Sequence, residues 1–225
     1  MCNLYGSTHE TGVRTYWRPN NELSPPWEGG VIGPRKPGPF VRRAKNAEGF
    51  LLGPDRELVI GRWGLIPWFS KTSDIKYSTN NARSEELTEK ASYKQPWLRG
   101  QRCIIPADWF NEPNWESGKN QWWRFRRADG APWGLAGLWN TWTDRETGEI
   151  HESYTMLTVN ADDHPLMRRM HKPDPKVGPD EQDKRSVIAI EESDVEQWLR
   201  GSKNDAAALL RAPAMEVIDA GPVAA

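Results

Sequence analysis

The stretch RCIIPADWFNEP (residues 102–113) decides the fold predicted for this chain. It opens with an unbroken apolar run around Cys103, which is typical of a strand buried on both faces. Near its end stands Glu112, which follows Trp109 and Phe110 and precedes Trp115. We therefore expect Cys103 to be an inert core residue. Aromatic surroundings predict a raised pKa for Glu112, suited to general acid or base catalysis, with an exposed loop glutamate as the alternative.

Short strand-like runs on both sides of this stretch indicate a mainly β architecture. They lie at residues 56–67, 121–128, 133–143, 153–159 and 215–220. A polar hairpin connection is predicted at 143–152, and residues 18–48 read as irregular chain with a short strand at 40–43. The predicted helices are few and lie at 84–93, 161–170, 192–200 and 204–212. The class is therefore α+β: a curved, mainly antiparallel β-sheet or barrel core with peripheral helices.

Composition sets limits on what the chain can be. At 225 residues a single domain over 1–225 is expected, with a polar, solvated loop insertion at 172–184 and a loose tail at 220–225. The net charge of −1 gives no overall attraction to nucleic acid, so a basic surface must be local. Two cysteines without a metal-ligand spacing suit a reducing compartment, and no membrane or export segment is visible. We expect a cytoplasmic protein. Thirteen tryptophans mostly suit core filling, although exposed ones stack well on flat ligands.

The opening MCNLYGS places Cys2 where removal of Met1 would leave an α-amine and a thiol on one residue. An α-amine titrates near 7.7–8.0, against about 10.4 for lysine, so far more of it is neutral at neutral pH. A neutral amine forms an imine with an aldehyde, and the thiol can then close a thiazolidine ring. Cys2 is therefore a candidate aldehyde trap. It could equally be a nucleophile with its own internal base, or a cysteine at this position by chance.

The segment STNNARSEE (residues 78–86) holds Asn81 and Arg83 just before a predicted helix. Free N–H groups at a helix start favour an anion, so the arginine could hold a phosphate while the Asn81 amide orients a carbonyl or ring oxygen. A helix cap with a surface ion pair is the competing interpretation.

The segment HPLMRRMHKP (residues 164–173) predicts a basic helical patch with Arg168, Arg169 and two histidines, His164 and His171. Together with Arg124, Arg126 and Arg127 on a neighbouring predicted strand, the patch could follow a phosphate backbone. A histidine near Cys2 could shuttle protons. No third ligand accompanies the histidines, so we expect no metal site and no cofactor. A solvated basic helix is the simpler alternative.

Five motifs taken together resemble the SRAP family, the SOS response-associated peptidases also described as abasic site processing proteins. They are MCNLY, RWGLIPW, NARSE, RCIIPADWFNE and LTVNADDHPLMRRMHKP, which occur in family order from position 2 to about 190. The resemblance implies a curved β fold whose positive groove binds abasic sites in single-stranded DNA or at single-strand/double-strand junctions. It further implies that the mature N-terminal cysteine joins the opened sugar as a thiazolidine, which shields the lesion in the DNA-damage response.

The resemblance also assigns site residues by motif. Cys2 is the crosslinking residue, Asn81 positions it and the sugar, Glu112 serves as acid or base, and His171 transfers protons and assists reversal. Arg83 resembles a phosphate-binding arginine, and the basic residues Arg168 and Arg169 supply salt-sensitive affinity. The remaining positions that fall along the family's DNA groove are Pro34, Trp63, Trp68 and Thr158.

The chain departs from the family pattern in three places. Asn3 and Leu4 follow the cysteine where the family has Gly-Arg, and Pro113 follows Glu112 where the family often has an aromatic residue. His171 is followed by the polar insertion 172–184 instead of directly by the family's next motif, and the pattern resumes at Arg185.

Two other function classes remain open at the level of sequence. Cys2 could hydrolyse amides with Asn81 helping to form an oxyanion hole, which would make the chain an N-terminal-cysteine peptidase. The chain could instead be a non-catalytic, tryptophan-rich module that binds single-stranded nucleic acid. The abasic-site interpretation predicts a monomer, cytoplasmic and nucleoid-associated when bound to DNA, with lyase-like activity besides the hydrolase activity in the family's name.

Overall fold

The fold is organised around β6 (Arg102–Asn114), in a computed structural model that describes residues 2–46, 51–178 and 182–224. The first half of β6 pairs with β8 and β3, and its second half pairs with β1 and β7. Side chains alternate between two cores: Cys103 and Ile105 enter one, and Ile104 enters the other. Burial on both faces accounts for the unbroken apolar run and confirms the strand predicted at 102–113.

Five strands close into a ring, in the order β9–β4–β3–β6–β8 and back to β9. Every neighbouring pair in the ring is antiparallel except β4 with β9. Closure removes exposed strand edges from the ring, which is how small barrels satisfy their backbone groups. The mixed barrel confirms the predicted α+β class. The other ring strands are β3 (Pro37–Lys45), β4 (Leu51–Trp63), β8 (Trp133–Thr143) and β9 (Ile150–Asn160).

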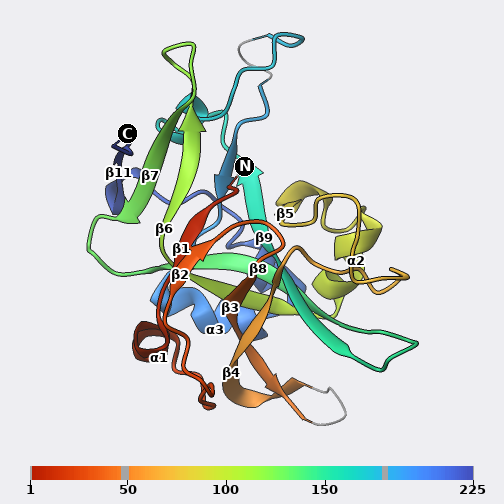
Figure 1. Cartoon of the computed structure of the whole chain (residues 1–225). Helices are drawn as coiled ribbons and strands as arrows, with labels where there is room; N and C mark the ends of the chain where they lie inside the picture. Colours follow the sequence, from red (N-terminus) through yellow and green to blue (C-terminus); the bar gives the residue numbers. More distant parts are fainter. Residues whose placement is uncertain (1, 47–50, 179–181, 225) are drawn as a thin grey trace.

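Outer strands extend this ring on two sides. β1 lies between β6 and β2, β7 joins β6 to β11, and both β5 and β10 pair with β9. In Figure 1 the red N-terminal segment begins close to β9 and runs down beside β6. The outer strands are β1 (Tyr5–Ser7), β2 (Gly30–Ile32), β5 (Asn81–Arg83), β7 (Gln121–Arg127), β10 (Arg185–Val187) and β11 (Ile218–Pro222).

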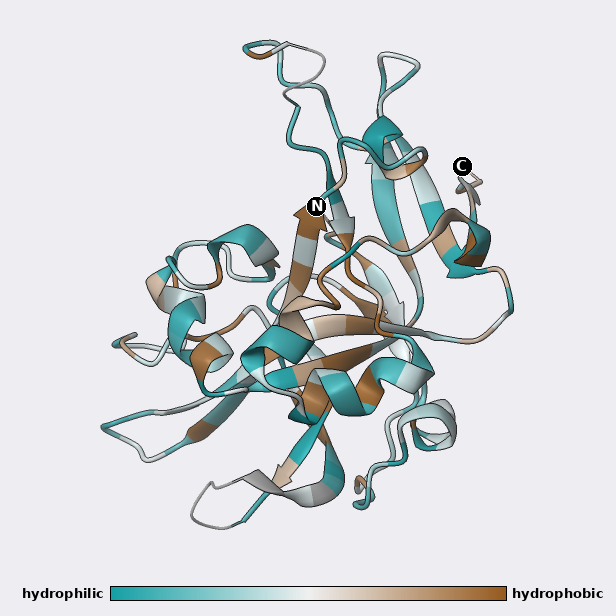
Figure 2. Cartoon of the chain, turned by 180° about the vertical axis from the view of Figure 1, so that it is seen from behind, coloured by the Kyte–Doolittle hydropathy of each residue, from teal (hydrophilic) through white to brown (hydrophobic). Residues whose placement is uncertain are grey.

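Short helices cover one of the two cores. Val13, Trp97 and Trp198 from three different helices pack there with Ile104. Seen from behind in Figure 2, the helices carry apolar bands between hydrophilic ones, and apolar residues line the central strands. The α-helices are α1 (Glu10–Trp17), α2 (Ala91–Leu98), α3 (Val195–Arg200) and α4 (Lys203–Ala207). The 3-10 helices described are η1 (Ser84–Glu86), η2 (Met167–Arg169), η4 (Glu192–Asp194) and η5 (Met215–Val217).

Several local predictions of helix and strand bounds were wrong. The helix predicted at 84–93 is interrupted: residues 84–86 form only the 3-10 helix η1, and regular helix begins at Ala91. Residues 81–83, just before the predicted helix, pair with β9 as β5. The helix predicted at 161–170 is only η2. The helix predicted at 204–212 ends at Ala207, and the strand predicted at 215–220 begins as η5.

Residues 18–48 are less irregular than predicted, since they contain β2 and the nine-residue β3, of which 40–43 is the middle. Residues 47 and 48 lie outside the described part of the chain. The sequence analysis missed α1 altogether, because Gly12 and β-branched residues give it low helix propensity. Burial of Val13 and Trp17 against the sheet stabilises it instead.

The connection predicted at 143–152 is confirmed as the hairpin between β8 and β9, where Thr143 pairs with Ile150. The Asp144 carboxylate accepts hydrogen bonds from the backbone N–H groups of Glu146 and Thr147, which fixes the turn. In the described part of the chain, no helix has the length and apolar character needed to cross a membrane.

We predict that Ile104→Ala destabilises the fold by about 2–5 kcal/mol, because it opens a cavity in a fully buried site on β6. Ile150→Ala is the matched control, since the Ile150 side chain on β9 is 64% exposed. Chemical denaturation of both variants measures the difference. Equal losses in the two variants would contradict the central position given to β6.

Candidate functional site

Backbone pairing with β6 holds the N-terminal segment in place. The Asn111 N–H donates to the Leu4 carbonyl at 3.0 Å, and Tyr5 pairs with Phe110. These contacts bury Cys2 completely, and its thiol donates to the Leu4 carbonyl at 3.5 Å. The cysteine is therefore positioned by main-chain hydrogen bonds of the strand that also carries Glu112.

Two neighbouring asparagines fix the same segment from the opposite side. The Asn81 amide Nδ2 donates to the Cys2 carbonyl at 2.7 Å, and the Asn80 Nδ2 donates to Asn3 Oδ1 at 3.1 Å. Asn81 can reach Cys2 because β5 pairs with β9, opposite Met156. The Asn81 Oδ1 is buried and has no hydrogen-bond partner among the described residues, so its acceptor capacity is available to a ligand.

Glu112 and His171 form a close pair at the end of β6. The Nε2 of His171 lies 2.8 Å from Oε2 of Glu112, whose side chain is 1% exposed. The main chain of His171 fixes the position of the imidazole. The backbone N–H of His171 donates to the Pro113 carbonyl at 2.6 Å, and the residue adopts a left-handed φ of +65°. The Lys184 ammonium donates to the carbonyls of Met170 and His171, both at 2.9 Å, and so closes the turn.

The electrostatics of Glu112 differ from the sequence-based expectation. Burial raises the pKa of this carboxyl, but the positive charges of the amino terminus and of His171 outweigh it, and the pKa is lowered. The raised pKa predicted from the aromatic neighbours was therefore wrong. The missing information is that two distant parts of the chain bring positive charge to the carboxylate.

The Cys2 thiol has the opposite behaviour. Burial first, and the nearby Glu112 carboxylate second, raise its pKa far above the usual range for a thiol. A thiol whose raised pKa favours the neutral form thus lies near a carboxylate whose lowered pKa favours the ionised form, and an imidazole nitrogen lies 2.8 Å from that carboxylate. This arrangement can take up or deliver a proton at a group that reacts with Cys2.

Cys103 is fully buried, as expected for a core residue, and burial raises its pKa as well. Among the described residues, no cluster of three or more His, Cys, Asp or Glu side chains could hold a metal ion.

The predicted aromatic DNA contacts divide into surface and core residues. Trp68 is 57% exposed and packs edge-on against Phe69, and Pro34 is also exposed. Trp63 is completely buried: its ring meets Tyr5 edge-on and its indole N–H donates to the Asn80 carbonyl at 2.8 Å. Trp63 therefore supports the segment around Asn80 from inside and exposes no face to a base.

Thr158 is also buried, at 1% exposure, so its side chain lines no surface groove. Its hydroxyl donates to the Ala82 carbonyl at 3.4 Å, and its own carbonyl accepts a hydrogen bond from Arg185 at 2.9 Å. Its position on β9 links β5 to β10.

The basic patch predicted on one helix is not continuous. Arg168 is exposed, but Arg169 makes two hydrogen bonds of 2.9 Å with Glu116. His164 lies against the Pro213 carbonyl at 2.9 Å, whereas His171 contacts Glu112, so the two histidines share no helix face. η2 is simply too short to align them.

Two of the three arginines of β7 make contacts with other protein side chains. Arg127 is held by Asp129 and Glu191, and the Arg124 guanidinium stacks on the ring of Trp109 at 3.8 Å. Arg126 is exposed, and a phosphate-binding surface shared with Arg168 stays a prediction.

Residues 172–178 of the insertion 172–184 are exposed, as expected of a solvated loop, and one side chain ties several of the described residues together. The Gln182 side chain bonds the backbone of Asp174 and the carbonyls of Val177 and Gly178. A cavity of about 500 Å³ lies between this loop and Trp115, next to His171. Sequence reasoning missed the roles of Gln182 and of Lys184, since a polar composition carries no signal of either.

Comparison with known proteins shows the family of this chain. The family described as SOS response associated peptidase (SRAP) matches residues 9–225, and the chain belongs to that family. Its members include proteins named for abasic site processing. The protein HMCES of Xenopus tropicalis is 32% identical over 148 residues, which are 57% of this chain and 44% of HMCES. The protein YoqW of Bacillus subtilis is 36% identical over 145 residues, 64% of this chain and 58% of YoqW.

The chain thus spans about half the length of the curated relatives it matches. Among solved structures, a protein from Bordetella bronchiseptica is 35% identical, with a TM-score of 0.82 and full coverage of both chains. A protein from Bacteroides thetaiotaomicron shares the fold at 22% identity, with a TM-score of 0.76 over 99% of this chain and 92% of that one.

We predict that Glu112→Gln accelerates alkylation of Cys2 by iodoacetamide on the order of tenfold, because loss of the carboxylate charge lowers the thiol pKa. Cys103 is the internal control, since burial and not Glu112 raises its pKa. Peptide mass spectrometry of the native protein measures both rates. Equal acceleration at both cysteines would point to general loosening of the fold and contradict the electrostatic coupling.

Proposed function

We propose that this protein recognises abasic sites in single-stranded DNA and, once Met1 is removed, captures the opened sugar as a thiazolidine on Cys2. One observation carries the proposal: a buried cysteine is held by Asn81 beside the Glu112–His171 pair. The relatives named for abasic site processing support the same substrate. Covalent capture would shield the lesion during the SOS response with which the family is associated.

The proposed reaction has two bond-forming steps. The α-amine nitrogen of Cys2 attacks the sugar aldehyde carbon, and loss of water gives an imine. The thiol sulfur then adds to the imine carbon while its proton passes to the nitrogen, closing the five-membered ring. Each step moves protons, and the Glu112–His171 pair at 2.8 Å supplies a donor and an acceptor. The same pair would catalyse opening of the closed sugar to its aldehyde.

The raised thiol pKa suits this order of events. A thiol that stays protonated does not compete with the amine for the aldehyde, and it needs a base only for ring closure. Amide hydrolysis, the alternative suggested by the family's name, requires a thiolate attack and free oxyanion donors. One N–H of the Asn81 amide donates to the Cys2 carbonyl, so only its second N–H could stabilise an oxyanion, which favours trapping over peptidase chemistry.

DNA binding is proposed to use the exposed members of the predicted set. Trp68 and Pro34 would stack on or pack against bases without reading sequence, and Arg168 would contribute salt-sensitive attraction. Arg83, 44% exposed beside Asn81, would hold a phosphate and so fix the sugar near Cys2. Trp63 and Thr158 would act indirectly, by supporting β5.

We expect wild-type protein to form an adduct with an abasic-site oligonucleotide that survives heat and detergent without borohydride. Cys2→Ala should form none while Cys103→Ala still does, because only Cys2 can present both amine and thiol. A denaturing gel measures this, after intact mass has shown that Met1 is absent. No adduct from protein lacking Met1 would refute covalent trapping and leave hydrolysis or simple binding.

Glu112→Gln should slow adduct formation by about 100-fold or more, the usual contribution of a general acid or base. Non-covalent affinity for the oligonucleotide should change little, because the carboxylate is buried and contacts no phosphate in this proposal. Time courses on the same gel give the rate, and fluorescence anisotropy gives the affinity. An unchanged rate would remove Glu112 from the proposed mechanism.

A further inference from the structure

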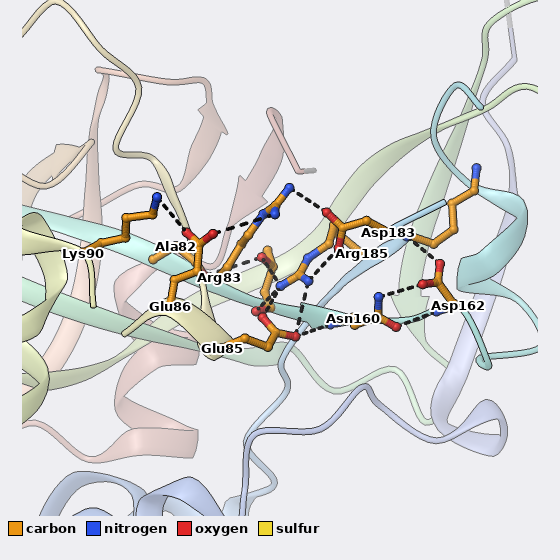
Figure 3. Close-up of polar contacts among 11 residues, drawn as sticks. Ala82, Arg83, Glu85, Glu86, Lys90, Asn160, Asp162, Asp183 and Arg185 are labelled. Carbon is orange, nitrogen blue, oxygen red and sulfur yellow. Dashed lines mark hydrogen bonds and ion pairs between the residues drawn. The ribbon is translucent and has the colours of Figure 1, made fainter. Parts of the chain in front are cut away.

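One carboxylate bridges two arginines at the edge of the candidate site (Figure 3). Arg83 Nη2 lies 2.6 Å from Asp183 Oδ2, and Arg185 Nη1 lies 3.1 Å from Asp183 Oδ1. Arg83 stands on β5, two residues from Asn81, whereas Asp183 is at the end of the insertion 172–184. The insertion thus places an acidic group on the arginine that is proposed to hold a DNA phosphate.

Asp183 is the main charge partner of Arg83. The only other carboxylate paired with Arg83 among the described residues belongs to Glu86, at 3.9 Å, and Glu86 is shared with Lys90. Arg185 has an additional strong partner, Glu85, at 2.7 Å. The ion pairs around Arg83 join three cations to three carboxylates, namely Arg83, Lys90 and Arg185 with Glu85, Glu86 and Asp183. Removal of Asp183 from this set leaves one positive charge in excess, at Arg83. A phosphodiester carries one negative charge and two acceptor oxygens, as a carboxylate does.

The two arginines differ in rigidity. The Arg185 side chain is 6% exposed, donates to the Thr158 carbonyl at 2.9 Å, and keeps a buried Nε without a partner among the described residues. Arg83 is 44% exposed and Asp183 is 40% exposed. The Asp183 carboxylate can therefore turn into water without disturbing the core, and the space that it leaves lies between a fixed guanidinium and a solvent-accessible one.

We propose that Asp183 occupies a phosphodiester site between Arg83 and Arg185 as an internal competitor, and that a DNA phosphate must displace it. The inference rests on the proposed function and adds a residue that sets DNA affinity. The free-energy cost of displacing Asp183 is the same for intact DNA and for DNA with an abasic site. It therefore lowers affinity for intact DNA, while an abasic site is still retained by the covalent bond to Cys2.

The test is Asp183→Asn, which removes the charge and keeps a residue that tolerates the left-handed φ of +46°. We expect it to bind an undamaged single-stranded oligonucleotide more tightly, on the order of fivefold at low salt. The matched control is Asp174→Asn, which removes the same charge from the same insertion, where the carboxylate accepts from the Lys176 N–H. Fluorescence anisotropy gives the dissociation constants, and thermal unfolding confirms that the variants fold.

A double-mutant cycle with Arg83→Gln isolates the interaction. Asp183→Asn should tighten binding only when Arg83 is present, so the double variant should bind no better than Arg83→Gln alone. Unchanged or weaker binding by Asp183→Asn would overturn the inference and make the ion pair a tether for the insertion. An equal gain in Asp174→Asn would overturn it in favour of net charge. If wild type binds the oligonucleotide but forms no abasic-site adduct, covalent trapping fails while the competition at Arg83 is still measured.

Discussion

The hydrogen-bond pairing of β6 with four other strands is the constraint on which the site depends. Its first half is locked between β3 and β8 inside the ring, and its second half extends between β1 and β7. The end of β6 is therefore rigid although it projects from the ring. Because Glu112 stands on that end and the Leu4 carbonyl accepts from Asn111, the carboxylate and the N-terminal segment share one frame. The N-terminal segment, normally among the most mobile parts of a chain, is thereby held in a fixed place.

Burial of the Glu112 carboxylate would be costly without compensation. His171 supplies it at 2.8 Å, and the charge of the amino terminus adds to it, so that the pKa falls in spite of burial. The same carboxylate raises the pKa of the Cys2 thiol. These shifts favour an ionised carboxylate beside a neutral thiol, which is the combination that the proposed amine-then-thiol reaction requires.

Predictions succeeded for features that depend on residues close together in the sequence. The apolar run at 102–113 indicated a doubly buried strand, and the motifs indicated the family, because both depend on side chains near one another in sequence. Predictions failed where a distant segment decides the outcome. Asn81 and Arg83 precede the short helix η1, as predicted, but no local pattern indicated that residues 81–83 would pair with β9 as a strand. Trp63 and Trp68 stand in one motif, but one fills the core and the other faces solvent. The charges that lower the pKa of Glu112 come from the amino terminus and from His171, and no local pattern reveals them.

The insertion 172–184 shows the same limit in its clearest form. Its composition predicted a polar, solvated loop, but residues next to both of its ends contact residues of the candidate site. Next to its start, His171 adopts a left-handed conformation with its N–H on the Pro113 carbonyl. At its end, the buried Lys184 ammonium binds the carbonyls of Met170 and His171, while the Asp162 carboxylate accepts from the Lys184 N–H. The insertion is therefore anchored at the residue that must hold the imidazole on Glu112. Since Asp183 immediately precedes that anchor and pairs with Arg83, the proposed proton-transfer pair and the proposed phosphate site would be coupled through a single short segment.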